Sequence, residues 1–257
     1  MKIFITGATG FIGKHLVKKL ISERNEVTVN LYGNEVSPFE KQVLTYQLNE
    51  NNVEADIEYF KEEQFDGIIH LASLYLTTHQ PSQAVKLIDS NVRFSTHILE
   101  CAAQSNTKWF INTGTFWQHY ENKDYSPVNL YAATKQAFES IAQYYWETNQ
   151  IKFATLKLCD TYGPNDTRPK IFNLWERIAR TGETLDMSPG EQIIDISHVS
   201  DIISAFYLLA QHLQNNNSEI NKGDVFAVKA GRRYTLRELA SEYERITKKK
   251  ININWGG

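Results

Sequence analysis

The sequence predicts an α/β protein with a doubly wound parallel sheet, and three observations lead to this fold class. The apolar residues 2–6 run directly into glycines spaced three apart, Gly7, Gly10 and Gly13, which is typical of a strand that turns tightly into a helix. Short apolar segments then alternate with longer amphipathic ones, as they do where helices connect parallel strands. The length of 257 residues, 42% of them apolar, suits one globular unit with or without a small second lobe.

The first two predicted elements enclose a phosphate-binding turn. Residues 2–6 are expected to form a buried strand and residues 11–21 the crossover helix. Gly7 permits the tight turn, Gly10 lets the backbone approach a pyrophosphate, and Gly13 allows the helix to pack closely on the strand. The N-terminus of the helix then provides a site for the anion.

The remaining elements continue this alternation. Further strands are expected in residues 26–31, 52–56, 65–72, 108–113, 152–158 and 224–230, and the alternation of apolar and polar residues predicts a short one in residues 251–255. Amphipathic segments predict helices in residues 81–105, 127–149, 198–213 and 234–247, and another that begins near Ile171.

Charge and cysteine content argue against several classes of function. A net charge of -3 at pH 7 gives no electrostatic reason to expect binding to nucleic acid or to an anionic membrane, since both favour clustered basic surface. Cys101 and Cys159 are the only cysteines, and neither has a metal-ligand spacing. The sequence shows no signal peptide and no long apolar span. We therefore expect a reduced, cytoplasmic protein without a metal site.

Tyr131 and Lys135 are candidate catalytic residues, because they lie four residues apart in a predicted helix. Such residues share a helix face, so the Lys135 ammonium can lower the pKa of the Tyr131 phenol from its usual value of about 10. A phenol tuned in this way exchanges protons near neutral pH. Taken alone, the pair fits a packed tyrosine beside a solvated lysine at least as well, and the glycine turn is what favours the catalytic interpretation.

Together these features resemble the extended short-chain dehydrogenase/reductase family, also described as the NAD-dependent epimerase/dehydratase family. Its members combine a nucleotide-sugar substrate with a nicotinamide dinucleotide on a Rossmann-type sheet. Further matches occur in order along nearly the whole chain: Asp56-Ile57, His70-Leu71-Ala72-Ser73, Asn91, Asn112-Thr113, Tyr162-Gly163-Pro164 and residues 195–201.

The resemblance implies a set of cofactor-binding residues: Gly7, Thr9, Gly10, Phe11, Ile12, Gly13, Asn34, Asp56, Ile57, Leu71, Ala72, Ser73, Asn91, Tyr131 and Lys135. Asp56 and Ile57 are expected to contact the adenine, unless Asp56 is an ordinary loop carboxylate. Asn91 is expected to reach the active-site lysine through water, although a solvent-facing asparagine fits nearly as well. His70 is expected to be a buried packing residue.

The resemblance also bears on the choice of dinucleotide. NAD-preferring relatives end the second strand with an acidic residue, whereas this chain has Asn30 or Leu31 there. The missing carboxylate removes repulsion against a 2′-phosphate, but no arginine arrives to bind one. NADP(H) is therefore slightly favoured over NAD(H).

For the reaction itself, the resemblance implies that Tyr131 is the acid/base, that Lys135 lowers its pKa and binds the nicotinamide ribose, and that Thr113 orients the substrate oxygen. Thr115 is the alternative hydroxyl, since it points to the same side if the strand persists. Dehydratases of the family place Asp-Glu directly after the threonine, where this chain has Gly114 and Thr115. Neither residue is an acid or base at neutral pH, which disfavours dehydration.

The expected substrate-binding residues are Thr115, Phe116, Asp160, Arg168 and Lys170. The aromatic segment that begins at Phe116 either forms a wall for a sugar or base or packs in the core. Relatives usually have asparagine at the position of Asp160, where an ionised carboxylate would repel a diphosphate. Arg168 and Lys170 either neutralise phosphate or are solvated loop charges.

The resemblance is strongest to synthases of CDP-3,6-dideoxyhexoses, which are 4-keto-sugar reductases. It implies an NAD(P)H-dependent reductase of a nucleoside-diphosphate 4-keto-6-deoxysugar. A nucleotide-sugar epimerase is one alternative, and it would require the keto intermediate to rotate in the site while the cofactor stays bound. A catalytically weak dinucleotide sensor is the other, because Asp160 and Ile194, which replaces an arginine, weaken the substrate site. Residues 1–160 are expected to be the dinucleotide-binding domain, with residues 191–213 packing back on it. Residues 161–257 are expected to form a substrate lobe that lacks part of its C-terminal end, and a homodimer is left open.

Overall fold

The computed structural model describes residues 1–215 and 219–257. The chain divides into two compact units. The first unit comprises Met1–Leu158 and Ser200–Val228, and the second comprises Cys159–Val199 and Lys229–Gly257. No helix in the described ranges is long and apolar enough to cross a membrane.

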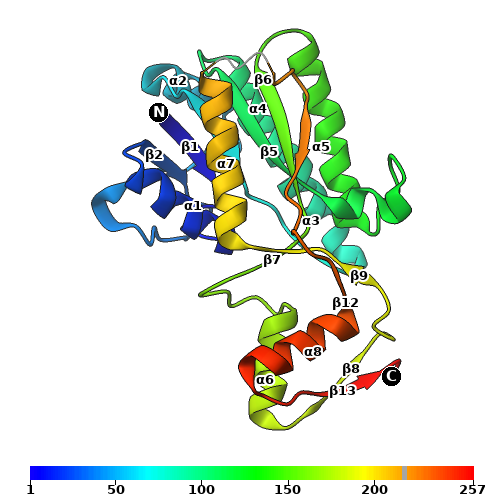
Figure 1. Cartoon of the computed structure of the whole chain (residues 1–257). Coiled ribbons are helices and arrows are strands. Elements are labelled where there is room, and N and C mark those ends of the chain that lie inside the picture. The colour runs from blue at the N-terminus through cyan, green and yellow to red at the C-terminus, as the bar shows by residue number, and fades with distance from the viewer. Residues whose placement is uncertain (216–218) are drawn as a thin grey trace. The chain divides into compact units, whose positions relative to one another are not determined.

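The first unit is built on a seven-stranded sheet in which the strand order is β11-β6-β5-β4-β1-β2-β3 (Figure 1). All neighbouring strands pair in parallel, which confirms the predicted α/β doubly wound class. The bounds are β1 Lys2–Thr6, β2 Glu26–Asn30, β3 Leu44–Tyr46, β4 Gly67–His70, β5 Trp109–Thr115, β6 Lys152–Leu158 and β11 Val225–Ala227. Because the chain progresses in opposite directions on the two sides of β1, a crevice for a ligand is expected at the carboxyl ends of β1 and β4.

Helices cover both faces of this sheet. Ile3 and Ile5 of β1 belong to a core with α1 and α7, whereas Phe4 between them belongs to a second core with α2, α4 and α5. The strand is therefore buried on both faces, as its uninterrupted apolar sequence predicts. The helices are α1 Phe11–Ser22, α2 Val53–Glu63, α3 Ala84–Ile88, α4 Phe94–Ala103, α5 Leu130–Glu147 and α7 Val199–Gln214, with a π-helical turn at Asp89–Arg93 and short 3-10 helices at Glu40–Gln42, Pro81–Gln83, Phe116–Gln118 and Tyr120–Asn122.

Two sequence-based expectations about these elements are wrong. Residues 52–56, expected to be the third strand, begin α2: the Asn52 side chain caps the helix by accepting a hydrogen bond from the Ala55 amide. The strand β11, expected in the lobe, pairs with β6 in the main sheet, so the returning segment is Ser200–Val228 rather than residues 191–213.

The second unit is smaller and has three two-stranded sheets and two helices. The pairs are β7 with β10 (parallel), β9 with β12 (antiparallel) and β8 with β13 (parallel). Their bounds are β7 Asp160–Tyr162, β8 Thr184–Met187, β9 Ile193–Ile194, β10 Ile196–His198, β12 Tyr234–Thr235 and β13 Asn252–Trp255, and the helices are α6 Ile171–Thr181 and α8 Leu236–Thr247. Trp175 of α6 packs with Leu236 and Leu239 of α8 in one small core.

Candidate active site

The glycine turn has the geometry of a phosphate-binding loop. Gly7 has φ +69°, and a Cβ there would lie 2.7 Å from the Ala72 amide nitrogen, while one on Gly13 would lie 2.2 Å from the Gly7 carbonyl oxygen. A Cβ on Gly10 would meet only that carbonyl, at 3.3 Å. Gly10 precedes α1 and provides no side-chain cap, so the first amides of the helix are available to an anion.

A cavity of about 650 Å³ borders this turn. Its lining residues come from the ends of β1, β2 and β4 and from the segment around the π-helical turn: Gly7, Thr9, Gly10, Asn30, Tyr32, Glu35, Glu50, Leu71, Ala72, Ser73, Leu74, Lys86, Asp89, Ser90, Arg93 and Phe94. The volume and the backbone lining fit an extended dinucleotide. Of the expected cofactor residues, the lining includes Gly7, Thr9, Gly10, Leu71, Ala72 and Ser73, but not Phe11, Ile12, Gly13, Asn34, Asp56, Ile57, Asn91, Tyr131 or Lys135.

Asp56 has a structural environment rather than the expected adenine-binding one. It is fully buried in α2, and its carboxylate accepts hydrogen bonds from the Tyr46 hydroxyl at 2.7 Å, the Asn49 amide at 2.9 Å and His97 at 2.8 Å. These bonds tie α2 to β3 and α4, and Ile57 packs beside them in the second core. The third strand ends at Tyr46, so the residues that directly follow it are Gln47 and Leu48 and not Asp56 and Ile57.

The strand β2 ends at Asn30, without an acidic residue, as expected, but the loop beyond it brings a carboxylate to the cavity. Asn30 is buried and accepts a hydrogen bond from the Leu48 amide, and Asn34 is exposed. Glu35, five residues beyond the strand, lines the cavity, and its carboxylate accepts hydrogen bonds from the Thr9 hydroxyl and the Tyr32 amide. A 2′-phosphate would therefore meet a carboxylate in this cavity, and NADP(H) is not favoured by the absence of one.

Tyr131 and Lys135 lie in the first turns of α5, which Asn129 caps by accepting a hydrogen bond from the Ala132 amide. Burial raises the pKa of Tyr131 to about 12, although a hydrogen bond with Ser73 acts in the opposite direction. Burial lowers the pKa of Lys135 to about 8, and the Glu139 carboxylate partly offsets this. The expected lowering of the Tyr131 pKa by Lys135 is thus not found in this structure, where burial dominates and keeps the phenol protonated at neutral pH.

A buried polar network fixes the surroundings of Tyr131. The Ser73 hydroxyl donates to Asn91 Oδ1 at 3.0 Å, and Asn91 Nδ2 donates to Thr134 Oγ1 at 3.0 Å. The Thr134 hydroxyl in turn donates to the Tyr131 carbonyl oxygen at 2.7 Å. Asn91 is fully buried in the π-helical turn, so it does not face solvent. It orients Ser73, which bonds to the phenol.

The two candidate threonines have different partners. The Thr113 hydroxyl donates its proton to the His70 carbonyl oxygen at 2.8 Å. The Thr115 oxygen accepts a hydrogen bond from the Trp117 amide at 3.3 Å and caps the 3-10 helix that Phe116 begins. This bond uses a lone pair of Thr115 and not its proton, which can still be donated.

His70 is a packing residue, as expected. Its ring is fully buried between the Thr6 and Ser95 hydroxyls, each at 2.8 Å. Burial and the charge of Lys135 hold the pKa of His70 well below its usual value, so the ring is neutral.

Tyr75 is a neighbour of the site that the sequence reasoning missed. Its ring meets the Tyr131 ring edge-on at a centroid distance of 5.1 Å and contacts Trp117 at 5.6 Å. The aromatic segment that was expected to form a wall thus reaches the site indirectly: its Trp117 contacts Tyr75, and Tyr75 contacts the catalytic candidate Tyr131. The available signal was the position of Tyr75 just beyond the carboxyl end of β4.

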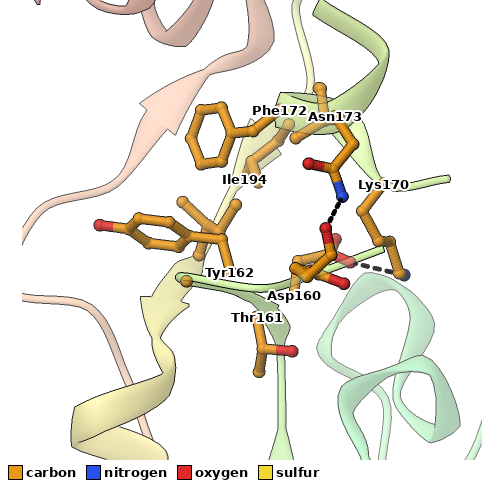
Figure 2. A pocket seen from close by; sticks show the side chains of 11 residues that line it. Asp160, Thr161, Tyr162, Lys170, Phe172, Asn173 and Ile194 are labelled. Atoms are coloured by element: carbon orange, nitrogen blue, oxygen red, sulfur yellow. Dashed lines mark hydrogen bonds and ion pairs between the residues drawn. The ribbon is translucent and has the colours of Figure 1, made fainter. Parts of the chain in front are cut away.

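The second unit contains a cavity of about 120 Å³ (Figure 2). It is lined by Asp160, Thr161, Tyr162, Gly163, Asp166, Lys170, Ile171, Phe172, Asn173, Ile194 and Ile196. Lys170 forms an ion pair with Asp160 at 3.1 Å, so the carboxylate that was expected to repel a diphosphate has a cation beside it. Phe172 and Ile194 provide an apolar wall.

Arg168 has a structural role in this loop. Its guanidinium group forms a bidentate pair with Asp166, with both distances 2.8 Å, and donates to the Thr161 carbonyl oxygen at 3.0 Å. It does not line the cavity. The expectation that Arg168 binds the substrate therefore finds no support in its contacts.

Residues 3–223 match the family described as NAD dependent epimerase/dehydratase. A CDP-abequose synthase from Yersinia pseudotuberculosis is 27% identical, with 100% of this chain and 88% of the relative covered. A UDP-glucose 4-epimerase from Lactobacillus helveticus is 23% identical, with coverage of 96% and 82%. The crystal structure of the Thermotoga maritima UDP-glucose 4-epimerase with UDP-glucose has a TM-score of 0.83 at 24% identity and covers 100% of this chain and 86% of that one. MoeE5 in complex with UDP-glucose and NAD also has a TM-score of 0.83, at 21% identity, with coverage of 100% and 85%.

The fold and the glycine-lined cavity define a dinucleotide-binding α/β protein. The chain belongs to the NAD dependent epimerase/dehydratase family, and it is a nicotinamide-dependent enzyme that modifies a nucleotide sugar.

Proposed function

We propose that the protein is an NAD(P)H-dependent reductase of a nucleoside-diphosphate 4-keto-6-deoxysugar. The observation that carries the proposal is the half-buried phenol of Tyr131, protonated at neutral pH, beside a strand that ends in Gly114-Thr115. The phenol is protonated at neutral pH and so has a proton to give, whereas neither Gly114 nor Thr115 can supply the acid or base that a dehydration needs. The similarity to CDP-abequose synthases supports the substrate class.

The reaction requires a hydride at C4 and a proton on the C4 oxygen. The reduced nicotinamide, when bound, supplies the hydride. Tyr131 donates its hydroxyl proton to the oxygen as the C4–O double bond becomes single, which gives a C4 hydroxyl and oxidised cofactor. Ser73, which Asn91 orients, holds the phenol in position before this transfer.

The residues proposed to hold the dinucleotide are those whose geometry fits it. The backbone of Gly7 and Gly10 and the adjacent N-terminus of α1 would bind the pyrophosphate. Leu71 and Ala72 would lie along the cofactor at the end of β4. Lys135 would bind the nicotinamide ribose, and its ammonium would stabilise the phenolate that is left when Tyr131 has given its proton.

Thr115 is the better candidate for the hydroxyl that orients the substrate oxygen. Thr113, the expected residue, already donates its single proton to the His70 carbonyl oxygen. The Thr115 oxygen accepts a hydrogen bond from the Trp117 amide, and its own hydroxyl proton can still be donated. We therefore propose Thr115 for this role and Thr113 for support of the strand. Phe116 follows directly and is proposed to contact the sugar.

In the second unit, Asp160 and Lys170 are the proposed substrate-binding pair. Lys170 would contact phosphate oxygens, while Asp160 limits its net charge. The apolar wall of Phe172 and Ile194 suits a base or a deoxysugar face better than a second phosphate. A homodimer and a cytoplasmic location stay predictions.

The decisive experiment is a panel of nucleoside-diphosphate 4-keto-6-deoxysugars incubated with the protein and reduced cofactor while NAD(P)H absorbance is followed. We expect one mole of cofactor to be oxidised for each C4 hydroxyl formed. The similarity to the Lactobacillus helveticus UDP-glucose 4-epimerase favours epimerisation as the second candidate. An epimerised product without net cofactor oxidation would support that candidate and contradict the reductase.

A further inference from the structure

We propose that Glu35 recognises the 2′-hydroxyl of the adenosine ribose and makes this protein select NAD(H) over NADP(H). The inference rests on the proposed dinucleotide site but not on the identity of the sugar or on the direction of the reaction. It reverses the cofactor preference expected from the sequence.

The Glu35 carboxylate is held in a defined place. The Glu35 amide donates to the Tyr32 carbonyl oxygen at 3.1 Å, which closes a turn in which Gly33 has φ +58°. One carboxylate oxygen accepts from the Tyr32 amide at 3.0 Å and the other from the Thr9 hydroxyl at 2.7 Å. The second bond links the loop after β2 to the glycine turn.

This place is the one that an adenosine ribose occupies in dinucleotide-binding sheets. One cavity is lined both by the glycine turn, through Gly7 and Gly10, and by the end of β2 and its loop, through Asn30, Tyr32 and Glu35. In such sheets the pyrophosphate lies over the glycine turn, and the ribose lies toward the end of the second strand, where an acidic residue accepts from the 2′-hydroxyl. Here Asn30 cannot perform that role, because it is buried and bonded to the Leu48 amide.

The carboxylate retains capacity for the ribose. An ionised carboxylate has about four lone-pair sites, and Thr9 and Tyr32 occupy two of them. Both of these donors are neutral, so they orient the negative charge without cancelling it. A ribose hydroxyl can donate to the remaining sites, whereas a 2′-phosphate would bring further negative charge against Glu35.

The cations in the cavity do not reverse this preference. Arg93 is paired with Glu50, and its Nε also lies 3.4 Å from Asp89, so two carboxylates already balance its charge. A 2′-phosphate would have to compete with both. Lys86, which also lines the cavity, is the cation that leaves some affinity for NADP(H).

The test is a fluorescence or calorimetric titration of the whole protein with NADH and with NADPH, without sugar substrate. We expect the wild type to bind NADH at least about tenfold more tightly than NADPH, and Glu35→Gln to reduce that ratio by about tenfold, mainly by improving NADPH binding. Thr9→Val, which removes one donor that orients Glu35, should reduce the ratio less. Glu26→Gln removes a carboxylate at the opposite end of β2 and is the matched control, in which the ratio should not change.

The outcomes separate this inference from the proposed function. Tighter or equal binding of NADPH by the wild type, or an unchanged ratio in Glu35→Gln, would overturn the role of Glu35 and leave the dinucleotide site intact. Failure of the folded wild type to bind either dinucleotide would overturn the proposed site and this inference together.

Discussion

The two cavities of this protein differ in how closely they follow the pattern of the family. The cavity of the first unit, about 650 Å³, borders a glycine turn and lies near a buried network that leads to Tyr131. The cavity of the second unit, about 120 Å³, has the ion pair of Asp160 with Lys170 and an apolar wall at positions where the family resemblance implies asparagine and arginine. We therefore expect changes in the first unit to affect the reaction and changes in the second unit to affect substrate binding. The variants below test this division from the largest expected effect to the smallest.

Tyr131→Phe should cause the largest loss. The variant retains the ring that packs edge-on against Tyr75 but removes the proton donor. We expect kcat to fall by about a thousandfold, within the range typical of a lost general acid, and dinucleotide affinity to stay nearly unchanged. Steady-state rates from NAD(P)H absorbance and a fluorescence titration measure the two quantities. If more than about a tenth of the activity remained, the barrier would have risen by less than about 1.4 kcal/mol, and Tyr131 would not be the acid.

Lys135→Met should reduce activity by about a hundredfold and, unlike Tyr131→Phe, weaken dinucleotide binding as well. It should nevertheless stabilise the protein, because Lys135 is buried and its pKa is lowered to about 8. The unfolded chain binds this proton more tightly, so wild-type stability should rise between about pH 8 and pH 10.5 as the buried lysine loses its charge. Below pH 8 the folded protein bears the full free-energy cost of burying the charged lysine, roughly 3 kcal/mol, and the methionine variant avoids this cost.

Urea unfolding at several pH values between 7 and 10 measures this effect. Lys157→Met is the contrasting variant, since Lys157 is also buried but forms an ion pair with Glu139 at 3.4 Å. Its removal takes away the ion-pair partner of the largely buried Glu139 carboxylate and should destabilise the protein. A Lys135→Met protein that is less stable than the wild type at pH 7 would show that Lys135 has a favourable buried partner.

The threonines provide a smaller but sharper test of the first unit. Thr115→Val should reduce kcat by about tenfold, because it removes the proton that orients the substrate oxygen, whereas Thr113→Val should cost stability more than rate. Thr115→Ser, which keeps the hydroxyl and the cap of the 3-10 helix, should restore most of the activity. If Thr113→Val lowered kcat more than Thr115→Val did, at equal melting temperatures, Thr113 would be the residue that orients the substrate oxygen, as expected from the sequence.

The sequence predicts those parts of the fold that depend on local pattern. The strand Lys2–Thr6, the glycine turn and the strand Lys152–Leu158 lie where expected, because each is an apolar run or a turn with its own steric requirement. The strand expected at residues 52–56 failed because Asn52 is a helix cap, and a short apolar segment does not distinguish strand from helix.

The parts of the site that the sequence did not predict depend on distant contacts. Asp56 owes its role to Tyr46 and to His97, which is 41 residues away. Glu35 is positioned by Thr9, 26 residues earlier. Both are ordinary acidic residues in the sequence, and only the folded chain shows that one is a buried structural carboxylate and the other faces a cavity.

Asp160→Asn should have the smallest effect and bears directly on the second unit. The change restores the residue usual in relatives and removes one negative charge beside Lys170, so a nucleotide diphosphate should bind more tightly. We expect KM for the nucleotide sugar to fall by about threefold with kcat unchanged, and the gain to shrink at high salt because it is electrostatic. Glu183→Gln, which removes an exposed carboxylate paired with Arg177 in the same unit, is the matched control and should leave KM unchanged. A rise in KM in Asp160→Asn would mean that the carboxylate accepts hydrogen bonds from the substrate. The ion pair of Asp160 with Lys170 would then be part of a recognition site particular to this chain, and not a tolerated departure from the family pattern.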